Sequence, residues 1–245
     1  MDPSLFGVCP HDTAKGSERW ALFNTLVNRR IGMKSRFTLY LDFGEFTRAL
    51  EGNELLWAYL NPADFVKAKT RFGYQGIARP GAHPDKACVI APAGAGTNGL
   101  TALAGKRLAA VRGYLFFLVA DRLETEGIPY TLVPAKSYPE VMSIVKRGDA
   151  DFGVTYNDHF EKLAPATQAE WERVESVDPG LAHVVAVHPS VSPETAEALR
   201  GFLLGATTDP DGQKALNTLG FSHFEAVPET PYMLLEELLA NAAKS

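Results

Sequence analysis

The chain has 245 residues, 46% of them hydrophobic and 22% charged, and its formal net charge is -5. Such a length allows one large domain or two lobes of roughly 100 to 150 residues each, and the composition is that of an ordinary folded protein. The basic residues form no cluster longer than Asn28-Arg29-Arg30, which disfavours nucleic acid as a partner because phosphate neutralisation dominates such binding. No apolar run reaches the length of about 18 residues that indicates a membrane span.

The first residues, MDPSLFGVCP, lack the basic start and the long apolar stretch of a secretory signal peptide. We therefore expect either a cytoplasmic protein or a periplasmic protein whose leader has been removed. Cys9 and Cys88 both fall in apolar, strand-like runs, where a buried thiol is the usual state and a disulfide is the alternative.

The histidines, at positions 11, 83, 159, 183, 188 and 223, show no pair with the spacing of an HxxxH motif. Neither cysteine has a partner at the spacing of a metal site. We therefore expect no metal and no cofactor.

Apolar runs alternate with amphipathic segments from the start of the chain, which is typical of a mostly parallel sheet with helices on its faces. Asn61 and Pro62 are expected to cap and open one of these helices. The predicted elements are a strand at 4–9, a helix at 17–31, a strand at 36–42, a helix at 45–51, a strand at 54–60 and a helix at 61–69.

The turn-forming stretch RPGAHP at 79–84 interrupts the pattern, and a second alternation follows it. Ser137 and Glu140 predict a capping box, and the last three helices are opened by Ser192-Pro193, Asp209-Pro210 and Thr230-Pro231. The predicted elements before those helices are strands at 86–93 and 106–111, a helix at 113–126, a strand at 130–133, a helix at 137–148, a strand at 151–155, a helix at 157–163 and a strand at 182–188.

The glycine spacing of GAGTNG at 94–99 matches the fingerprint of dinucleotide-binding folds. That motif must open a long helix, whereas any helix here has to end by Gly105, because KRLAAV already has the pattern of the next strand. We therefore interpret this segment as a surface loop and expect no nucleotide.

Two α/β units separated by two crossings, near residues 81 and 180, predict an α/β fold of two lobes. The first lobe is expected to contain residues 1–80 plus 181–245, and the second lobe residues 81–180. Each lobe would hold a mixed, mostly parallel sheet flanked by helices, with the crossings acting as hinges.

Ligands of parallel sheets bind beyond the carboxyl ends of the strands, where helix N-termini present unpaired N–H groups that favour anions. Four junctions have this character: CPHDT at 9–13, LNPAD at 60–64, AVRGY at 110–114 and TYNDH at 155–159. The candidate ligand-binding residues at them are Tyr59 and Asn61 of the first lobe, Arg112, Tyr114, Tyr156, Asn157 and Asp158 of the second, and His11 and Asp12 at the rim.

These residues also have structural interpretations. Asn61 and Asn157 are suited to helix capping, and the tyrosines to packing at strand ends. Arg112 lies where a helix begins and suggests an anionic partner, whereas Asp158 suggests an amine. No serine or cysteine is identified as a nucleophile for His11 and Asp12, so we expect no enzyme; an enzyme that uses His11 or Asp158 as a base is an alternative.

The chain resembles the periplasmic solute-binding proteins of the phosphate, phosphite and phosphonate ABC transporter type, which have the type 2 periplasmic binding fold. The resemblance covers nearly the whole length. It is carried by FGVCPHDTAKGSERWALFNTLVNRRIG, GNELLWAYLNPADFVKA, LAGKRLAAV, SYPEVMSIVKRGDADFGVTYND and HPSVSPETAEALRGFLLGATTDPDGQKALNTLGFSHFEAV.

The resemblance implies a monomeric, periplasmic binding protein that closes around a small polar, anionic ligand and delivers it to an ABC transporter permease. A module that signals to a sensor kinase is an alternative on the same fold. Phosphonate binders of this type carry a Ser/Thr-rich turn where this chain has Ala110-Val111-Arg112-Gly113-Tyr114. This departure puts a phosphonate or phosphate ligand in doubt, although Arg112 supplies a charge there.

Overall fold

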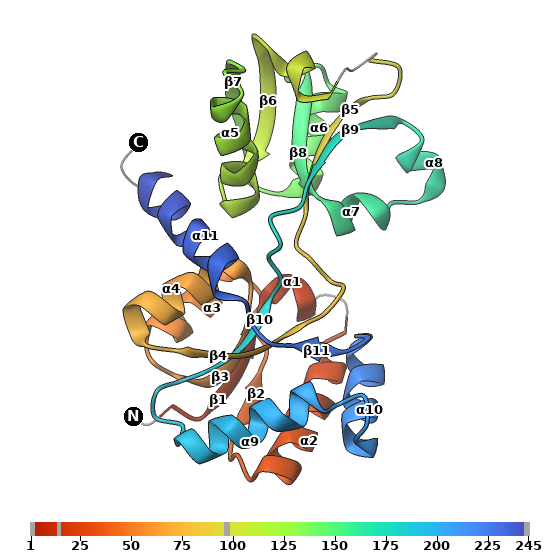
Figure 1. Cartoon of the computed structure of the whole chain (residues 1–245). Helices are drawn as coiled ribbons and strands as arrows, with labels where there is room; N and C mark the ends of the chain where they lie inside the picture. The colour runs from red at the N-terminus through yellow and green to blue at the C-terminus, as the bar shows by residue number, and fades with distance from the viewer. Residues whose placement is uncertain (1–2, 14–15, 96–98, 243–245) are drawn as a thin grey trace. The chain divides into compact units, whose positions relative to one another are not determined.

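A computed structural model describes residues 3–13, 16–95 and 99–242 (Figure 1). Contacts divide the chain into two compact units. Unit 1 holds the described residues up to His83 together with Ala182–Met233, and unit 2 holds Pro84–Leu181 together with the described residues from Leu234. In the part of the chain that is described, no helix is both long and apolar enough to cross a membrane.

Unit 1 is built on a six-stranded mixed sheet with the order β11-β4-β10-β3-β1-β2. β1 pairs in parallel with β2 and β3, whereas β10 is antiparallel to both β3 and β4, and β11 is antiparallel to β4. The strands are β1 (Leu5–Val8), β2 (Arg36–Thr38), β3 (Leu55–Leu60), β4 (Gln75–Pro80), β10 (Val184–Val187) and β11 (Phe224–Glu225).

Helices cover both faces of this sheet (Figure 1). The helices are α1 (Pro10–Thr13), α2 (Glu18–Ile31), α3 (Phe43–Glu51), α4 (Pro62–Phe72), α9 (Pro193–Leu204), α10 (Pro210–Leu219) and the first part of α11 (Glu229–Ala242). The boundary between the two units falls inside α11, after Met233. The apolar sides of α2, α9 and α10 form one buried cluster with residues of β1, β3, β4 and β10.

Unit 2 contains a five-stranded mixed sheet with the order β7-β6-β8-β5-β9. β6 is parallel to β7 and β8, whereas β5 is antiparallel to β8 and β9. The elements are β5 (Ala87–Pro92), a 3-10 helix (Gly99–Leu103), β6 (Lys106–Val111), α5 (Tyr114–Thr125), β7 (Tyr130–Ala135), α6 (Tyr138–Lys146), β8 (Phe152–Tyr156), α7 (Asn157–Glu161), α8 (Pro165–Gln168) and β9 (Trp171–Val177).

The two-lobed α/β fold predicted from the sequence is confirmed. The sheets are mixed but not mostly parallel as predicted, since two of the five strand pairings in unit 1 and two of the four in unit 2 are parallel. Three details also differ. The strand predicted at 36–42 ends at Thr38, where its pairing with β1 stops opposite Gly7, and Leu41 beyond it is 80% exposed. In the predicted capping box, Ser137 Oγ accepts from Glu140 N, but the Glu140 carboxylate accepts from Lys136 N instead of the Ser137 amide. The sequence analysis also missed α1, the 3-10 helix, β4, β9, β11 and α8.

The core of unit 1 is organised around Trp57, whose ring stacks on Phe6 with centroids 3.8 Å apart. Its indole N–H is buried and needs an acceptor, which Ser35 Oγ provides at 2.8 Å. Asn24 and Asn28 in turn hold Ser35 through its hydroxyl and backbone. The hydrogen bonds from Asn24 and Asn28 through Ser35 to Trp57 thus connect helix α2 to the sheet.

The two cysteines are buried and are not joined in a disulfide, so the thiol interpretation is confirmed and the disulfide alternative is wrong. Cys9 follows β1 in unit 1, whereas Cys88 lies within β5 in unit 2.

His188, directly after β10, is buried as a neutral ring. Ser190 N donates to His188 Nδ1 at 3.0 Å, so the hydrogen is on Nε2, which donates to Asn53 Oδ1 at 2.6 Å. Asn53 adopts a φ of 62°, a left-handed conformation that asparagine tolerates better than most residues. Burial lowers the pKa of His188 from its ordinary value of 6.5.

We predict that unit 1 loses stability in mild acid through His188. Because the pKa of His188 is lower in the folded state, the unfolded chain takes up the proton first as the pH falls. The contribution of His188 to the free energy of unfolding is therefore complete above about pH 6.5 and declines below that pH. Urea denaturation followed by tryptophan fluorescence, repeated over this pH range, measures the slope. The profile of His188→Gln should be flatter, and two parallel profiles would contradict the prediction.

Candidate functional site

The four junctions predicted as ligand-facing are all turns from a strand into a helix. They connect β1 with α1, β3 with α4, β6 with α5 and β8 with α7. The first two belong to unit 1 and the last two to unit 2. Each junction therefore presents first-turn N–H groups that have no partner within their own helix.

In unit 2, the parallel pairing of β6 with β8 brings two of these junctions to one edge of the sheet. The register pairs Ala109 with Gly153 and Ala110 with Val154, so Arg112 and Tyr156 lie at the same level where the strands end. The sequence-predicted residues Arg112, Tyr114, Tyr156, Asn157 and Asp158 are thereby gathered at this edge.

Helix α5 begins without a side-chain cap, as do α2, α7 and α8. Its N-cap is Gly113, which has no side chain to accept from the first turn, and within the described chain an added Cβ there would meet nothing within 4 Å. The start of α5 therefore pairs a positive helix end with open space. By contrast, α3, α4, α6, α9 and α10 are capped by the side chains of Asp42, Asn61, Ser137, Ser192 and Asp209.

A buried carboxylate that the sequence analysis missed lies at the same edge. Asp85 is 1% exposed, and its Oδ1 accepts from the Tyr156 hydroxyl at 2.6 Å. It was missed because it belongs to the turn-rich segment before β5, and only the antiparallel pairing of Ala87 with Tyr156 brings that segment beside β8.

The remaining unit 2 candidates have distinct surroundings. Asn157 donates its backbone N–H to Lys86 O at 2.9 Å, and its Oδ1 is buried without a hydrogen-bond partner in the described part of the chain. The carboxylate of Asp158 is paired with Lys162 one turn along α7, so its charge is already partly neutralised. The Tyr114 ring packs against the apolar cluster under α5.

The unit 1 candidates Tyr59 and Asn61 are both buried. The ring of Tyr59 stacks on His183 with centroids 5.1 Å apart. Asn61 caps α4 as its sequence position predicts, since its Oδ1 accepts from Asp64 N at 2.9 Å, and its Nδ2 donates to the Asp64 carboxylate at 2.6 Å. Burial raises the pKa of Asp64, and the bond from Asn61 opposes that shift.

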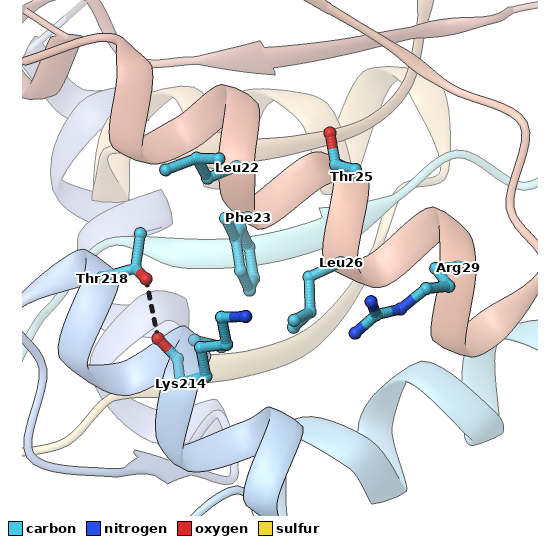
Figure 2. A pocket seen from close by; sticks show the side chains of 8 residues that line it. Leu22, Phe23, Thr25, Leu26, Arg29, Lys214 and Thr218 are labelled. Carbon is cyan, nitrogen blue, oxygen red and sulfur yellow. Dashed lines mark hydrogen bonds between the residues drawn. The ribbon is translucent and has the colours of Figure 1, made fainter.

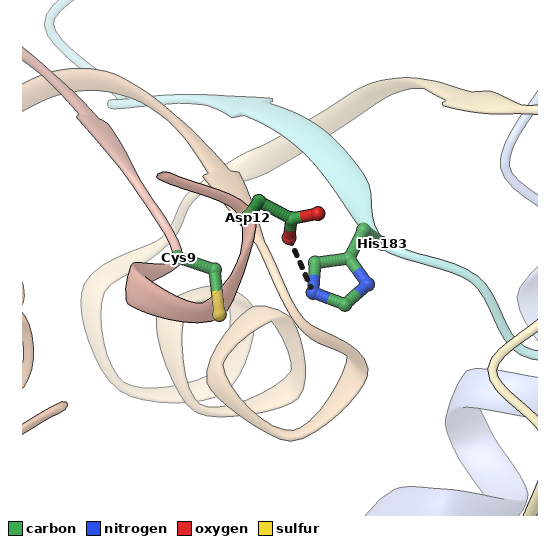
Figure 3. A group of neighbouring side chains, drawn as sticks. All are labelled: Cys9, Asp12 and His183. Carbon is green, nitrogen blue, oxygen red and sulfur yellow. Dashed lines mark ion pairs between the residues drawn. The ribbon is translucent and has the colours of Figure 1, made fainter. Parts of the chain in front are cut away.

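Asp12 is engaged by a residue that the sequence analysis did not single out. Its Oδ2 lies 3.2 Å from Nε2 of His183, which immediately precedes β10 and is 4% exposed (Figure 3). The side chain of His11 lies outside the described part of the structure, so its role as a rim contact stays a prediction.

A shallow pocket of about 150 Å³ lies elsewhere, between α2 and α10 of unit 1 (Figure 2). None of its lining residues belongs to the four junctions, and we assign it no ligand. It is lined by Leu22, Phe23, Thr25, Leu26, Arg29, Lys214, Ala215 and Thr218.

Solved structures with the same arrangement define the class of fold. The PhnD1 protein of Prochlorococcus marinus, in complex with methylphosphonate, matches with a TM-score of 0.77 at 13% identity over 100% of this chain and 99% of that one. XAC2383 of Xanthomonas citri, bound to ATP, matches with a TM-score of 0.73 at 16% identity over 100% and 98%. The aliphatic sulphonate binding protein SsuA of Escherichia coli matches with a TM-score of 0.71 at 9% identity over 99% and 93%.

At these identities the likeness shows the fold alone, which is the two-lobed type 2 periplasmic binding fold. No curated protein matches the chain in sequence. The family model described as "ABC transporter, phosphonate, periplasmic substrate-binding protein" matches residues 6–232, and the chain belongs to this family. It is a family of periplasmic binding proteins, not of enzymes, whose members bind a small ligand and work with a transporter.

We predict that Tyr156→Phe destabilises unit 2 by about 1.5 to 3 kcal/mol, because the buried Asp85 carboxylate loses a hydrogen-bond donor. Urea denaturation of the purified variants measures the loss. Tyr130→Phe is the matched control, since its ring packs against the same apolar cluster and its hydroxyl has no hydrogen bond within the described chain. Equal stabilities of the two variants would contradict the role given to the Tyr156–Asp85 bond.

Proposed function

We propose that the protein binds a small phosphonate-like oxyanion and that the start of α5 in unit 2 holds its anionic group. The observation that carries the proposal is the helix N-terminus at Gly113, which no side chain caps and beside which Arg112 is placed. A tetrahedral anion there accepts from first-turn N–H groups, and the helix dipole favours its charge.

The uncapped start of α5 and Arg112 compensate for the missing Ser/Thr-rich turn, which phosphonate binders carry where this chain has residues 110–114. Their Ser/Thr-rich turn offers hydroxyl donors, whereas this chain offers backbone N–H groups and Arg112. A guanidinium donates two parallel hydrogen bonds to an oxyanion, and such charge-assisted bonds are stronger than those from a neutral hydroxyl. The absence of the hydroxyls therefore changes how the anion is held without removing the means of holding it.

The other candidates at this edge have separate roles in the proposal. Tyr156 and Tyr114 supply apolar ring surface for the organic part of the ligand, and Asn157 supplies an amide for a further hydrogen bond. Asp158 contributes less than its sequence position suggested, because Lys162 already pairs with it.

For unit 1, we propose ligand contacts for His11 and Asp12, which lie on the turn after β1. The burial of Tyr59 and Asn61 favours a positioning role for both, since Tyr59 packs in the core and Asn61 caps α4.

A binding assay with Arg112 variants tests the proposal. Isothermal titration with methylphosphonate, phosphate, phosphite and methanesulfonate identifies the anion that binds. Arg112→Ala should weaken that affinity by about 10-fold to 100-fold, which corresponds to the loss of charge-assisted hydrogen bonds. Arg112→Lys should fall between, because it keeps the charge and loses the two-pronged geometry.

Arg107→Ala is the matched control, because Arg107 lies near the opposite end of the same strand in an exposed ion pair with Asp151. It should bind as the unchanged protein does. The proposal fails if Arg112→Ala and Arg107→Ala bind the anion equally well.

A further inference from the structure

Three metal-ligating side chains meet in unit 1, separate from the residues at the start of α5. Cys9 Sγ, a carboxylate oxygen of Asp12 and a ring nitrogen of His183 all lie within 4.8 Å of one another. Figure 3 shows the Asp12 carboxylate directed toward the His183 ring, with Cys9 on the same turn as Asp12. The spacing search along the sequence missed this group, because His183 is far from the other two in the chain and comes beside them only through the pairing of β10 with β3.

The turn that carries Cys9 and Asp12 is held by its own backbone. Cys9 N donates to Tyr59 O at 2.9 Å, and Asp12 N donates back to Cys9 O at 3.0 Å. Arg19 and Trp20 both donate to the Asp12 carbonyl oxygen. The turn is thereby fixed at both ends, and the two side chains start from defined positions.

Contacts around the three side chains also restrict them. Tyr59 stacks on the His183 ring, which fixes the ring plane. Asn61 Nδ2 lies 3.6 Å from Cys9 Sγ, so the sulfur receives an N–H donor of the kind that orients and supports a metal ligand from outside its coordination sphere. A side chain that is already oriented loses less conformational entropy when it binds.

The distances suit a tetrahedral site with one open position. Ligand atoms of a tetrahedral zinc ion lie about 3.3 to 3.8 Å apart, given metal–ligand bonds of about 2.0 to 2.3 Å. His183 Nε2 and Asp12 Oδ2, 3.2 Å apart, are already close to that value, and Cys9 Sγ lies within 4.8 Å of the other two ligand atoms. Cys9 is fully buried, and the Asp12 side chain, 15% exposed, is the most exposed of the three.

The donor types select the class of metal. Hard ions such as Mg²⁺ and Ca²⁺ prefer oxygen ligands alone, whereas a thiolate with an imidazole selects Zn²⁺, Co²⁺ and related ions. A thiolate and a carboxylate carry two negative charges, which a divalent ion neutralises.

We propose that Cys9, Asp12 and His183 bind a divalent transition-metal ion of the Zn²⁺ class, with a water molecule as the fourth ligand. The Cys9 thiol gives its proton to solvent on binding, and no electron is transferred. The site takes no residue from the start of α5, and Asp12 is the one proposed ligand contact that it uses, so either proposal can fail without the other.

Cobalt titration of the metal-stripped, reduced protein tests the site, because Co²⁺ replaces Zn²⁺ in such sites and reports its ligands by absorption. The expected result is one Co²⁺ per chain, with a thiolate-to-cobalt charge-transfer band that Zn²⁺ abolishes. Cys9→Ser should remove the band, and His183→Gln and Asp12→Asn should each weaken Co²⁺ affinity at least about tenfold.

Cys88→Ala is the control for the thiol, since Cys88 is buried in unit 2 and burial raises its pKa to about 11. It should keep the band and the affinity. Asp12→Asn keeps the volume of the side chain, so it remains informative if Cys9→Ser or His183→Gln does not fold, as judged by circular dichroism. The proposal is overturned if no Co²⁺ binds, if the bound ion gives no thiolate band, or if Asp12→Asn binds Co²⁺ as tightly as the unchanged chain.

Discussion

The parallel pairing of adjacent strands is the constraint on which the functional edge of unit 2 depends. Because β6 and β8 run in the same direction and Ala110 faces Val154 in the register, both strands release their following helices at one edge. The N-terminus of α5 and the Tyr156-Asn157 turn are neighbours for this reason alone. A shift of the register would separate Arg112 from Tyr156 and would turn every side chain of the strand to the other face of the sheet.

Antiparallel strands then supply groups that the parallel strands cannot. β5 and β10 each run against a parallel neighbour, so the residues before them arrive at the edge where the parallel strands end. That is how Asp85 reaches Tyr156 in unit 2 and how His183 reaches Asp12 in unit 1. In both units, a residue from the entry of an antiparallel strand therefore completes a polar cluster at a strand-to-helix turn.

The sequence was sufficient for the features that are local in the chain. The cap of Asn61 on α4 and the strand-to-helix turn at Arg112 follow from short patterns, and the structure has them where they were expected. Asp85 and His183 were not predicted as site residues, because they come beside Tyr156 and Asp12 only through strand pairings between segments that are distant in the chain. The edge strand predicted at 36–42 is shorter in the structure, since apolar alternation does not reveal where the pairing with the neighbouring strand stops. The ligand roles of the predicted residues stay predictions.

The central claim is that the first turn of α5 holds the anion. The most direct measurement is a titration of the 15N-labelled protein with methylphosphonate, followed by backbone amide correlation spectra. The account predicts that the largest shifts occur at the amides of Gly113, Tyr114 and Leu115, since an oxyanion that accepts from an N–H group deshields it. Saturable shifts elsewhere, with these three amides unmoved, would contradict it.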